Sequence, residues 1–503
     1  MRRAVRRLIR GIATTLLGLW LGVAGAHAQG DLTGANASPG GAPAAGADVR
    51  QFHGDAARSG LFHLPGMTEA KVRGMAAAPL WQAPVDGPVY AQPLLWTAPG
   101  GQRLLIVATE QDEVFALDAG DGRVVWRAAL GRPVPPDDLP CGDISPMGIT
   151  GTPVIPGGTI YLDAMTEAGG AVRHLLFALD AGSGRVLAGW PVDVAARLAA
   201  EGRRFVAANQ GERGALAAEG GKIFVPYAGH FGDCAFYHGW VVGVPMSDPA
   251  VLGAWATRAR GGGIWAPGGV VSDGTSLYVA TGNTIGADGQ FGDGEAVFRL
   301  GFGPAYTGDT ADFFAPGNWQ ELDDADLDLG ATNPVLAGPS VVQLGKDGNA
   351  YLLDRADLGG IGTAAAVRHV SSVPIRTAPA SYRLGGIRYV VFQAEGVGCP
   401  GGRGGDLVAL KVGAGAPGQI AVAWCAEENG LGAPIVTEDA AGEPIVWAVG
   451  AEGDERLRAF RGSDGTVLFT SAPMGLVRRY TTLIASGTRL YVGADRAVYA
   501  FGY

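Results

Sequence analysis

The chain has 503 residues, of which 47% are hydrophobic and only 17% are charged, so it can bury a large core and is not a disordered protein. Its formal net charge of −10 excludes a surface built to attract nucleic acid or anionic lipid. The 83 glycines are spread along the whole length without a collagen period, which indicates many tight turns.

Residues 1–28 are predicted to be a cleaved export signal. MRRAVRRLIR is a basic segment, GIATTLLGLWLGVAG is an apolar stretch, and AHA at 26–28 is a small-x-small cleavage site. We favour cleavage over a retained membrane anchor because the apolar run is short for a span. Cleavage removes five arginines and no acids, so the net charge of −10 becomes −15. We expect a periplasmic or secreted protein, without a membrane anchor, that begins near Gln29.

Residues 29–48 are small, polar and rich in proline and glycine, which predicts a disordered leader. The remaining chain, 49–503, shows no linker and is expected to be one domain. In it a unit recurs: an apolar strand, a polar loop, a second strand, a tight turn and a third strand. The clearest copy, 104–130, has the turn GDG and carries Trp126 in its third strand. The eight copies lie at 104–130, 159–190, 222–244, 276–300, 341–355, 389–412, 445–469 and 489–501.

These copies predict an all-β, eight-bladed propeller of four-stranded blades. Each copy is preceded by another short apolar segment, such as YAQPLLW or YTTLIAS, which supplies a fourth strand. A β-sandwich with additional domains is disfavoured because the copies follow one another strictly. The last copy stops after its third strand, and APLWQAPVDG (78–87) resembles a fourth. We therefore expect the N-terminal strand to close the ring and leave no open sheet edge.

The string VFALDAGDGRVVW (114–126) closely resembles the repeat of bacterial quinoprotein dehydrogenases and their non-catalytic relatives. FHGDAARSG, CGDISPMGITGTPVI, LYVATGN and GKDGNAYLLDR are similar to a family of exported propellers described as pyrroloquinoline-quinone-like (PQQ-like), mostly of unknown activity. The resemblance spans residues 50–503 and implies a quinoprotein-like fold. For catalytic members it also implies PQQ and calcium as cofactors, a disulfide between adjacent cysteines, and a Glu/Asn/Asp set around the calcium. This chain has no adjacent cysteines, and we match no such set, so we assign no catalytic residue and no metal ligand.

Any site is expected on one face of the propeller. With the strands of a blade labelled A to D from the channel outward, the C–D turns are minimal, whereas B–C loops such as 229–238 and 281–295 are long and polar. Function usually lies where loops are elaborate. We therefore place a site at the B–C face, at the mouth of the channel.

Three kinds of side chain belong to that face. Arg213, Arg376 and Arg479 lie near the starts of A strands, where they can converge on a carboxylate or be neutralised by neighbouring acids. Trp265 can stack on a planar ring or pack between blades. The acids can bind a cation or cap turns; they are Glu110, Glu167 and Asp233, with Asp112 and Asp143. His230 and His238 have no clear third zinc ligand, and the run 323–330 has its glycine one position late for an EF-type calcium loop.

The four cysteines of an exported chain predict two disulfides, Cys141–Cys234 and Cys399–Cys425. In the second pair one cysteine follows strand B and the other ends strand D of the same blade. Two strand spacings are roughly 10 Å, more than a bridge allows, so the glycine-rich loop GCPGGRGG must fold inward.

Two functions remain open. The first is a monomeric binding or scaffold module without catalysis, whose partner is a protein or a small anionic ligand. The second is a PQQ-dependent dehydrogenase of a small alcohol or sugar. The missing adjacent cysteines, the unmatched calcium set and the lack of a haem motif favour the first. A hydrolase or lyase lacks a recognisable carboxylate pair.

Overall fold

The structure is a computed structural model that describes residues 46–402, 404–413 and 419–503. The predicted signal peptide and most of the predicted leader lie outside the described residues. The end of the leader is already bonded to the domain: Thr97 donates its hydroxyl proton to Asp48 at 2.6 Å, and Ser486 donates to the carbonyl of Ala47 at 2.8 Å.

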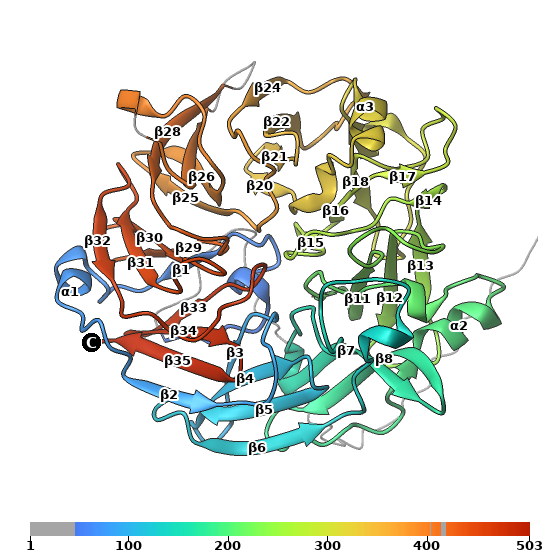
Figure 1. Ribbon diagram of the computed structural model, residues 1–503, viewed down its shortest axis with the longest axis horizontal. Helices are drawn as coiled ribbons and strands as arrows, with labels where there is room; N and C mark the ends of the chain where they lie inside the picture. Colours follow the sequence, from blue (N-terminus) through green and yellow to red (C-terminus); the bar gives the residue numbers. More distant parts are fainter. Residues whose placement is uncertain (1–45, 403, 414–418) are drawn as a thin grey trace, which may run out of the picture. The chain divides into compact units, whose positions relative to one another are not determined.

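Eight sheets are arranged as the blades of a propeller (Figure 1), as the repeats predict. Blade one contains β3 (Leu94–Thr97), β4 (Arg103–Thr109), β5 (Glu113–Asp118) and β6 (Val124–Ala129). Blade two contains β7 (Thr159–Ala168), β8 (Ala171–Asp180) and β9 (Val192–Asp193), and its inner strand is reduced to a bridge between Val154 and Tyr161. Blade three contains β10 (Ala217–Glu219), β11 (Lys222–Tyr227), β12 (Trp240–Pro245) and β13 (Gly253–Ala256). Blade four contains β15 (Val271–Ser272), β16 (Leu277–Thr281), β18 (Ala296–Leu300) and β19 (Phe313–Ala315).

The second half of the ring repeats the same meander. Blade five contains β20 (Val335–Ala337), β21 (Ser340–Leu344), β22 (Asn349–Asp354) and β24 (Ala366–His369). Blade six contains β25 (Ala380–Leu384), β26 (Ile387–Gln393), β27 (Leu407–Val412) and β28 (Ile420–Ala426). Blade seven contains β29 (Ile435–Glu438), β30 (Pro444–Val449), β31 (Leu457–Arg461) and β32 (Val467–Thr470). Blade eight contains β33 (Ile484–Ser486), β34 (Arg489–Ala494) and β35 (Ala497–Gly502).

Smaller elements decorate the blades. They are β1 (Leu61–His63), β14 (Arg260–Gly261), β17 (Thr284–Ile285), β23 (Gly360–Ile361) and the helices α1 (Glu69–Arg73), α2 (Val194–Ala200) and α3 (Trp319–Asp324). Within the described part of the chain, no helix has the length and apolar character that crossing a bilayer requires.

The N-terminal strand closes the ring. β2 (Trp81–Pro84) pairs antiparallel with β35, with Trp81 opposite Ala500. The fourth strand of blade eight therefore comes from residues more than 400 positions earlier in the chain, and the segment APLWQAPVDG supplies it as predicted. This pairing removes the open edge that an incomplete last blade would leave.

The tryptophan and the turn glycine recur in the repeats because the two residues pack against each other. A Cβ added at Gly122 would lie 2.7 Å from the ring of Trp81, at Gly184 2.6 Å from Trp126, and at Gly465 2.7 Å from Trp424. Each tryptophan comes from the outer strand of one blade, and each glycine from the C–D turn of the next. These glycines have φ between 70 and 77°, a conformation that glycine tolerates without strain. The repeat signature is therefore a contact between neighbouring blades.

An N-terminal plug, residues 49–63, fills the channel. Its backbone accepts hydrogen bonds from Ile155, Ser272, Ser381 and Val436, which lie in or directly after the inner strands of four blades. At the axis Phe52, in the short helix η1 (Phe52–Gly54), packs in a buried cluster with alanines of three different blades, namely Ala215, Ala378 and Ala433. The string FHGDAARSG is thus not a blade strand but the part of the chain that ties the blades together at the centre.

Arg58 fixes this plug from within. Its side chain is only 1% exposed, and it donates to the carbonyls of Phe52, Leu216 and Val270. Burial lowers the pKa of Arg58 to about 10, so the guanidinium keeps its charge at neutral pH. A buried cation bound by carbonyl groups of two blades is costly to replace, because each carbonyl would lose its donor.

Candidate functional site

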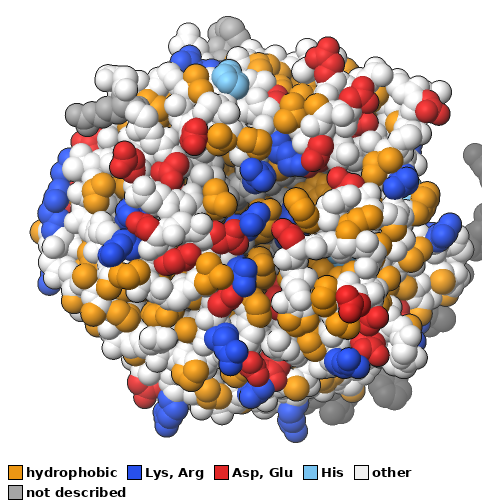
Figure 2. Space-filling view, in the orientation of Figure 1, with side chains coloured by type: hydrophobic (Ala, Val, Ile, Leu, Met, Phe, Trp, Pro, Cys, Tyr) orange, Lys and Arg blue, Asp and Glu red, His pale blue; other side chains and the backbone are white. Residues whose placement is uncertain are grey.

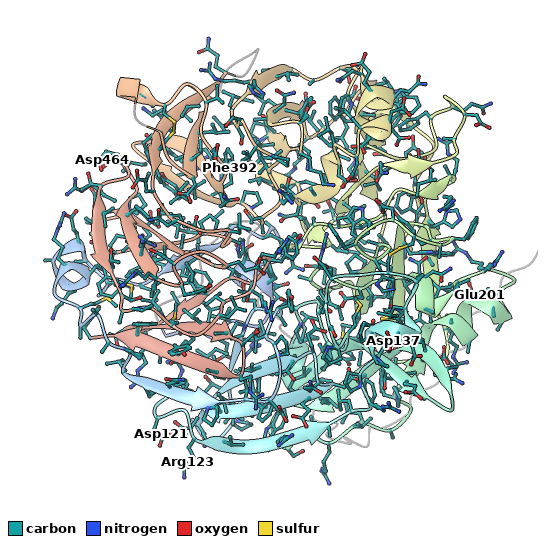
Figure 3. All side chains as sticks on the ribbon, viewed as in Figure 1. Asp121, Arg123, Asp137, Glu201, Phe392 and Asp464 are labelled. Atoms are coloured by element: carbon teal, nitrogen blue, oxygen red, sulfur yellow. A yellow bond between two sulfur atoms is a disulfide. The ribbon has the colours of Figure 1, made fainter. Side chains whose placement is uncertain are left out.

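The two faces of the propeller differ as the loop lengths predict. The C–D turns are short and carry charged side chains outward at the rim, as Asp121, Arg123 and Asp464 show in Figure 3. The B–C loops and the connections between blades are longer. Three of the four cysteines lie there, and Cys425 lies near the end of β28. They form the predicted pairs, Cys141–Cys234 and Cys399–Cys425, with Cα–Cα distances of 6.2 and 5.8 Å.

The glycine-rich loop of blade six makes its disulfide by reaching outward to the outermost strand of the blade, β28, rather than by folding inward as expected. A Cβ added at Gly396 would lie 2.6 Å from the sulfur of Cys399 and 2.6 Å from that of Cys425. Only a residue without a side chain leaves room for the bridge at this point, and the loop composition therefore serves the disulfide.

Two adjoining cavities lie at the B–C end of the channel. The mouth pocket has a volume of about 260 Å³, and its lining includes Arg213, Asp233, Trp265, Lys346, Arg376 and Tyr480. The side pocket has a volume of about 450 Å³, and its lining includes Thr377, Gln393, Glu395, Asp406, Asn429 and Arg479. The side pocket shares Arg376 and Tyr480 with the mouth pocket. Figure 2 shows a face hollowed near its middle, with both basic and acidic side chains around the hollow.

Arg213 is held between two aromatic rings. Its guanidinium carbon lies 4.4 Å from the ring centroid of Tyr480 and 5.1 Å from that of Trp265, and its Nε donates to the carbonyl of Trp265 at 3.1 Å. Among the residues that the structure describes, Arg213 has no ion-pair partner. Its charge is therefore fixed in place by aromatic faces and a carbonyl rather than neutralised by an acid.

Arg376 and Arg479 differ in their partners. Arg479 donates from Nε to Glu452 at 2.6 Å. This arginine is therefore neutralised by a neighbouring acid, the second of the two roles considered for it. Arg376 is exposed and forms no ion pair within the described ranges. Because Arg376 belongs to both pockets, it is the cationic group most accessible to a ligand there.

The predicted acids are not gathered into one cluster. Asp233 lines the mouth pocket, accepts a hydrogen bond from the hydroxyl of Tyr237, and has a pKa raised by burial. Glu167 pairs with Arg132 at 2.9 Å, and Glu110 is fully buried, where one carboxylate oxygen accepts the backbone N–H of Gly148 at 2.7 Å. Glu110 and Glu167 lie outside the lining of both pockets.

Several pocket residues were not anticipated from the sequence. Tyr480 and Thr377 each directly follow an arginine that the sequence analysis had placed near the channel. The same argument from position, just before an inner strand, could therefore have identified them. Lys346 donates to Asp326 at 2.8 Å and also pairs with Asp328. It is one of only four lysines after the predicted signal, in the B–C loop of blade five.

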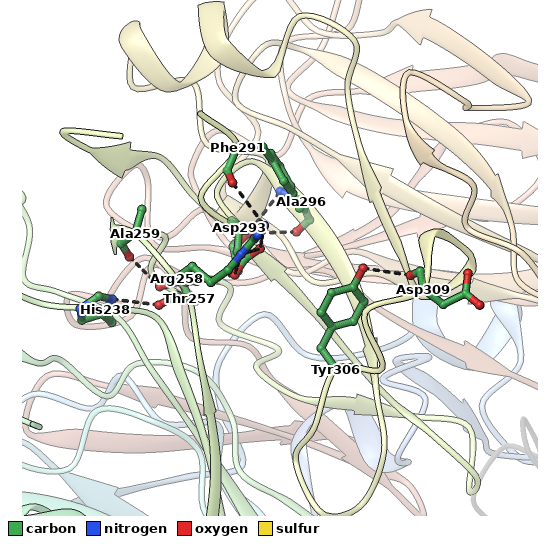
Figure 4. A network of polar contacts seen from close by, with 10 residues as sticks. His238, Thr257, Arg258, Ala259, Phe291, Asp293, Ala296, Tyr306 and Asp309 are labelled. Atoms are coloured by element: carbon green, nitrogen blue, oxygen red, sulfur yellow. Dashed lines mark hydrogen bonds and ion pairs between the residues drawn. The ribbon is translucent and has the colours of Figure 1, made fainter. Parts of the chain in front are cut away.

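The two histidines near Cys234 make backbone contacts. His230 Nε2 lies 3.1 Å from the carbonyl oxygen of Ala208, and His238 Nδ1 lies 3.0 Å from that of Thr257 (Figure 4). Beside His238, Arg258 binds Asp293 through two nitrogens and fixes the B–C loop of blade four. In the described ranges, no group of three or more His, Cys, Asp or Glu side chains is arranged to hold a metal ion.

The residues at the mouth do not fit a quinone held together with a divalent metal. The ammonium of Lys346 already occupies the cation position between Asp326 and Asp328. The guanidinium of Arg213 already covers a face of Trp265, the ring on which a planar cofactor would stack.

Comparisons with known proteins agree with this architecture. A family model described as outer membrane protein assembly factor BamB matches residues 69–225. No curated protein matches the chain. Quinohemoprotein alcohol dehydrogenase from Comamonas testosteroni is 16% identical, with a TM-score of 0.64 over 90% of this chain and 80% of that one. BamB from Moraxella catarrhalis is 15% identical, with a TM-score of 0.52 over 85% and 99%.

A europium-containing methanol dehydrogenase is 13% identical, with a TM-score of 0.58 over 91% of this chain and 98% of that one. At such identities the likeness concerns the fold. The eight-bladed ring, the repeat signature and these matches together show a PQQ-like, quinoprotein-type β-propeller fold.

Proposed function

We propose that this propeller is a non-catalytic binding module that holds a small anionic ligand at the B–C end of its channel. The observation that carries the proposal is Arg376, an exposed guanidinium shared by two adjoining cavities without an ion-pair partner in the described residues. A guanidinium binds a carboxylate through two parallel hydrogen bonds. Arg213, whose cation is held on two aromatic rings, also lines the mouth pocket.

A binding role agrees better with the mouth than a dehydrogenase role. The solved dehydrogenases support the alternative through their fold, but Lys346 already pairs with Asp326 and Asp328, and Arg213 already covers a face of Trp265. The match to a family described as an assembly factor supports a role in binding. Two disulfides favour an oxidising compartment, which supports export to the periplasm or the medium.

A protein partner is the second candidate, and exposed apolar side chains at the rim favour it. Phe231 is 61% exposed beside the mouth pocket, and Leu431 is 37% exposed beside the side pocket. Exposed aromatic groups next to a charged pocket are typical of surfaces that receive another macromolecule.

Calorimetric titration with a panel of carboxylates tests the proposal. Wild-type protein is expected to bind at least one of adipate, citrate and glucuronate, and Arg376→Met is expected to weaken that binding about 10- to 100-fold, because a charge-assisted contact is lost. Arg383→Met, on an exposed side chain of β25, is the matched control and should bind like the wild type. Absence of binding by every probe, or unchanged affinity in Arg376→Met, would refute the proposal.

A further inference from the structure

The side pocket offers more polar groups than a simple carboxylate can use. Its acids have partners without a ligand: Glu452 pairs with Arg479, and both oxygens of Asp406 accept backbone N–H groups, from Glu428 and Gly430. Glu395 accepts the hydroxyl proton of Ser372 at 3.2 Å. Arg376 therefore remains as the group that selects a negative charge.

Two neutral side chains in the pocket wall are nearly buried and have unused hydrogen-bonding capacity. Thr377 is 2% exposed, and its hydroxyl has no partner among the described residues. Gln393 is 6% exposed, and its amide forms no hydrogen bond within that part of the chain. A buried polar group without a partner costs free energy until a ligand or water satisfies it. Both groups can donate and accept.

The remaining wall is apolar on one side and polar on the other. Val373, Pro374 and Leu431 contribute apolar surface, while Asn429 adds a further amide. The volume of about 450 Å³ falls in the range of sites for small organic molecules. A ligand that fits must therefore present C–H surface to one wall and several groups that both donate and accept to the other.

Two simpler classes of ligand do not satisfy the polar groups of this pocket. A carboxylate without hydroxyl groups satisfies Arg376 but leaves Thr377 and Gln393 unpaired. An ammonium-bearing ligand suits Glu395, but an ammonium group only donates and cannot accept from the amide of Gln393. Hydroxyl groups can donate to the carboxylates and accept from the amides at the same time.

We propose that the ligand is a polyhydroxylated carboxylate of sugar-acid size. Arg376 binds its carboxylate, and Thr377, Gln393 and Asn429 bind its hydroxyl groups. This inference rests on the proposed function and specifies the chemical class of its ligand.

Titrations with four matched probes test this class. They are glucuronate, adipate (six carbons without hydroxyls), glucose (hydroxyls without charge) and lysine (a zwitterion with an ammonium side chain). Glucuronate is expected to bind at least about 10-fold more tightly than the other three, since a site built for hydroxyl groups rejects analogues that lack them. Equal binding of adipate or tighter binding of lysine overturns the inference while the carboxylate site stands. Equal binding of glucose, or no binding of any probe, overturns the carboxylate site itself.

Variants separate the two halves of the site. Gln393→Met removes an amide of similar size and should weaken glucuronate binding at least about 10-fold while leaving adipate binding unchanged. Asn429→Gly serves as a second variant, because Asn429 has φ of 62°, which glycine adopts without strain. If both variants bind glucuronate like the wild type, the hydroxyl contacts are refuted. Arg376→Met should weaken glucuronate and adipate alike.

Discussion

The buried carboxyl of Glu110 makes the stability of this propeller depend on pH in a defined direction. Its side chain is 0% exposed, one oxygen accepts the N–H of Gly148, and the other has no partner among the described residues. Burial raises the pKa of Glu110 from 4.5 to about 7, and that of its neighbour Asp112 from 3.8 to about 8. Both carboxyls are therefore protonated in the folded protein under conditions where they ionise in the unfolded chain.

The sign and size of the effect follow by linkage. Below pH 4.5 Glu110 is protonated in both states, and its contribution to the free energy of unfolding is constant. Between pH 4.5 and about 7 the unfolded chain loses the proton and the folded protein keeps it, so stability falls as pH rises. At about 1.4 kcal/mol per pKa unit, the loss over this window is on the order of 3 kcal/mol.

Urea unfolding of wild type and Glu110→Gln between pH 4.5 and 8 measures this directly. The glutamine keeps an oxygen for the N–H of Gly148 but cannot ionise, so the variant should gain about 3 kcal/mol relative to the wild type as pH rises from 4.5 to 7. Glu69→Gln is the control, because hydrogen bonds from Arg461 lower the pKa of Glu69 to about 2, below the whole window. A difference between wild type and Glu110→Gln that stays constant with pH would refute the reasoning.

Three further predictions concern the plug, a disulfide and catalysis. Arg58→Met should lower the free energy of unfolding by about 3 kcal/mol, because three carbonyls lose a donor, whereas exposed Arg73→Met should change it little; denaturant titration compares them. The double variant Cys399→Ser/Cys425→Ser should lose about 3 kcal/mol in the same assay, as expected for a bridge that spans 26 residues, and an unchanged midpoint would contradict this. Dye-linked assays with added PQQ and calcium should detect no oxidation of simple alcohols or aldoses, and activity that disappears on chelation would overturn the proposal of a non-catalytic module.

Much of the fold could be predicted because the repeat is itself a contact. The tryptophan of one blade and the turn glycine of the next recur in the sequence since each pair must meet in space, as Trp126 and Gly184 do. The closing strand could be found for the same reason, because its Trp81 packs against the turn glycine of the next blade, Gly122. The plug could not be found in this way, because its segment occurs once and makes its contacts mainly through backbone groups.

The candidate site could be predicted from the sequence only in part. Arg213, Arg376 and Arg479 were placed near the channel from their positions before inner strands, and the structure brings all three to the two pockets. Which arginine has an acidic partner was not predictable, because Glu452 of blade seven reaches Arg479 through a turn that no repeat specifies. Gln393 also escaped notice, since an amide at the end of an ordinary strand carries no local signal.

The plug and the pockets are parts of one arrangement around the axis. Phe52 packs on Ala215, Ala378 and Ala433, and the residues two positions earlier, Arg213, Arg376 and Leu431, all line the pockets. Only one residue separates the members of each pair, so the plug contacts and the pocket lining come from the same three connections between blades. The alanines are small because Phe52 occupies the centre at their level, and the longer side chains above them fill the mouth. The N-terminal segment that ties the blades together is therefore in contact with the same three segments whose side chains line the pockets.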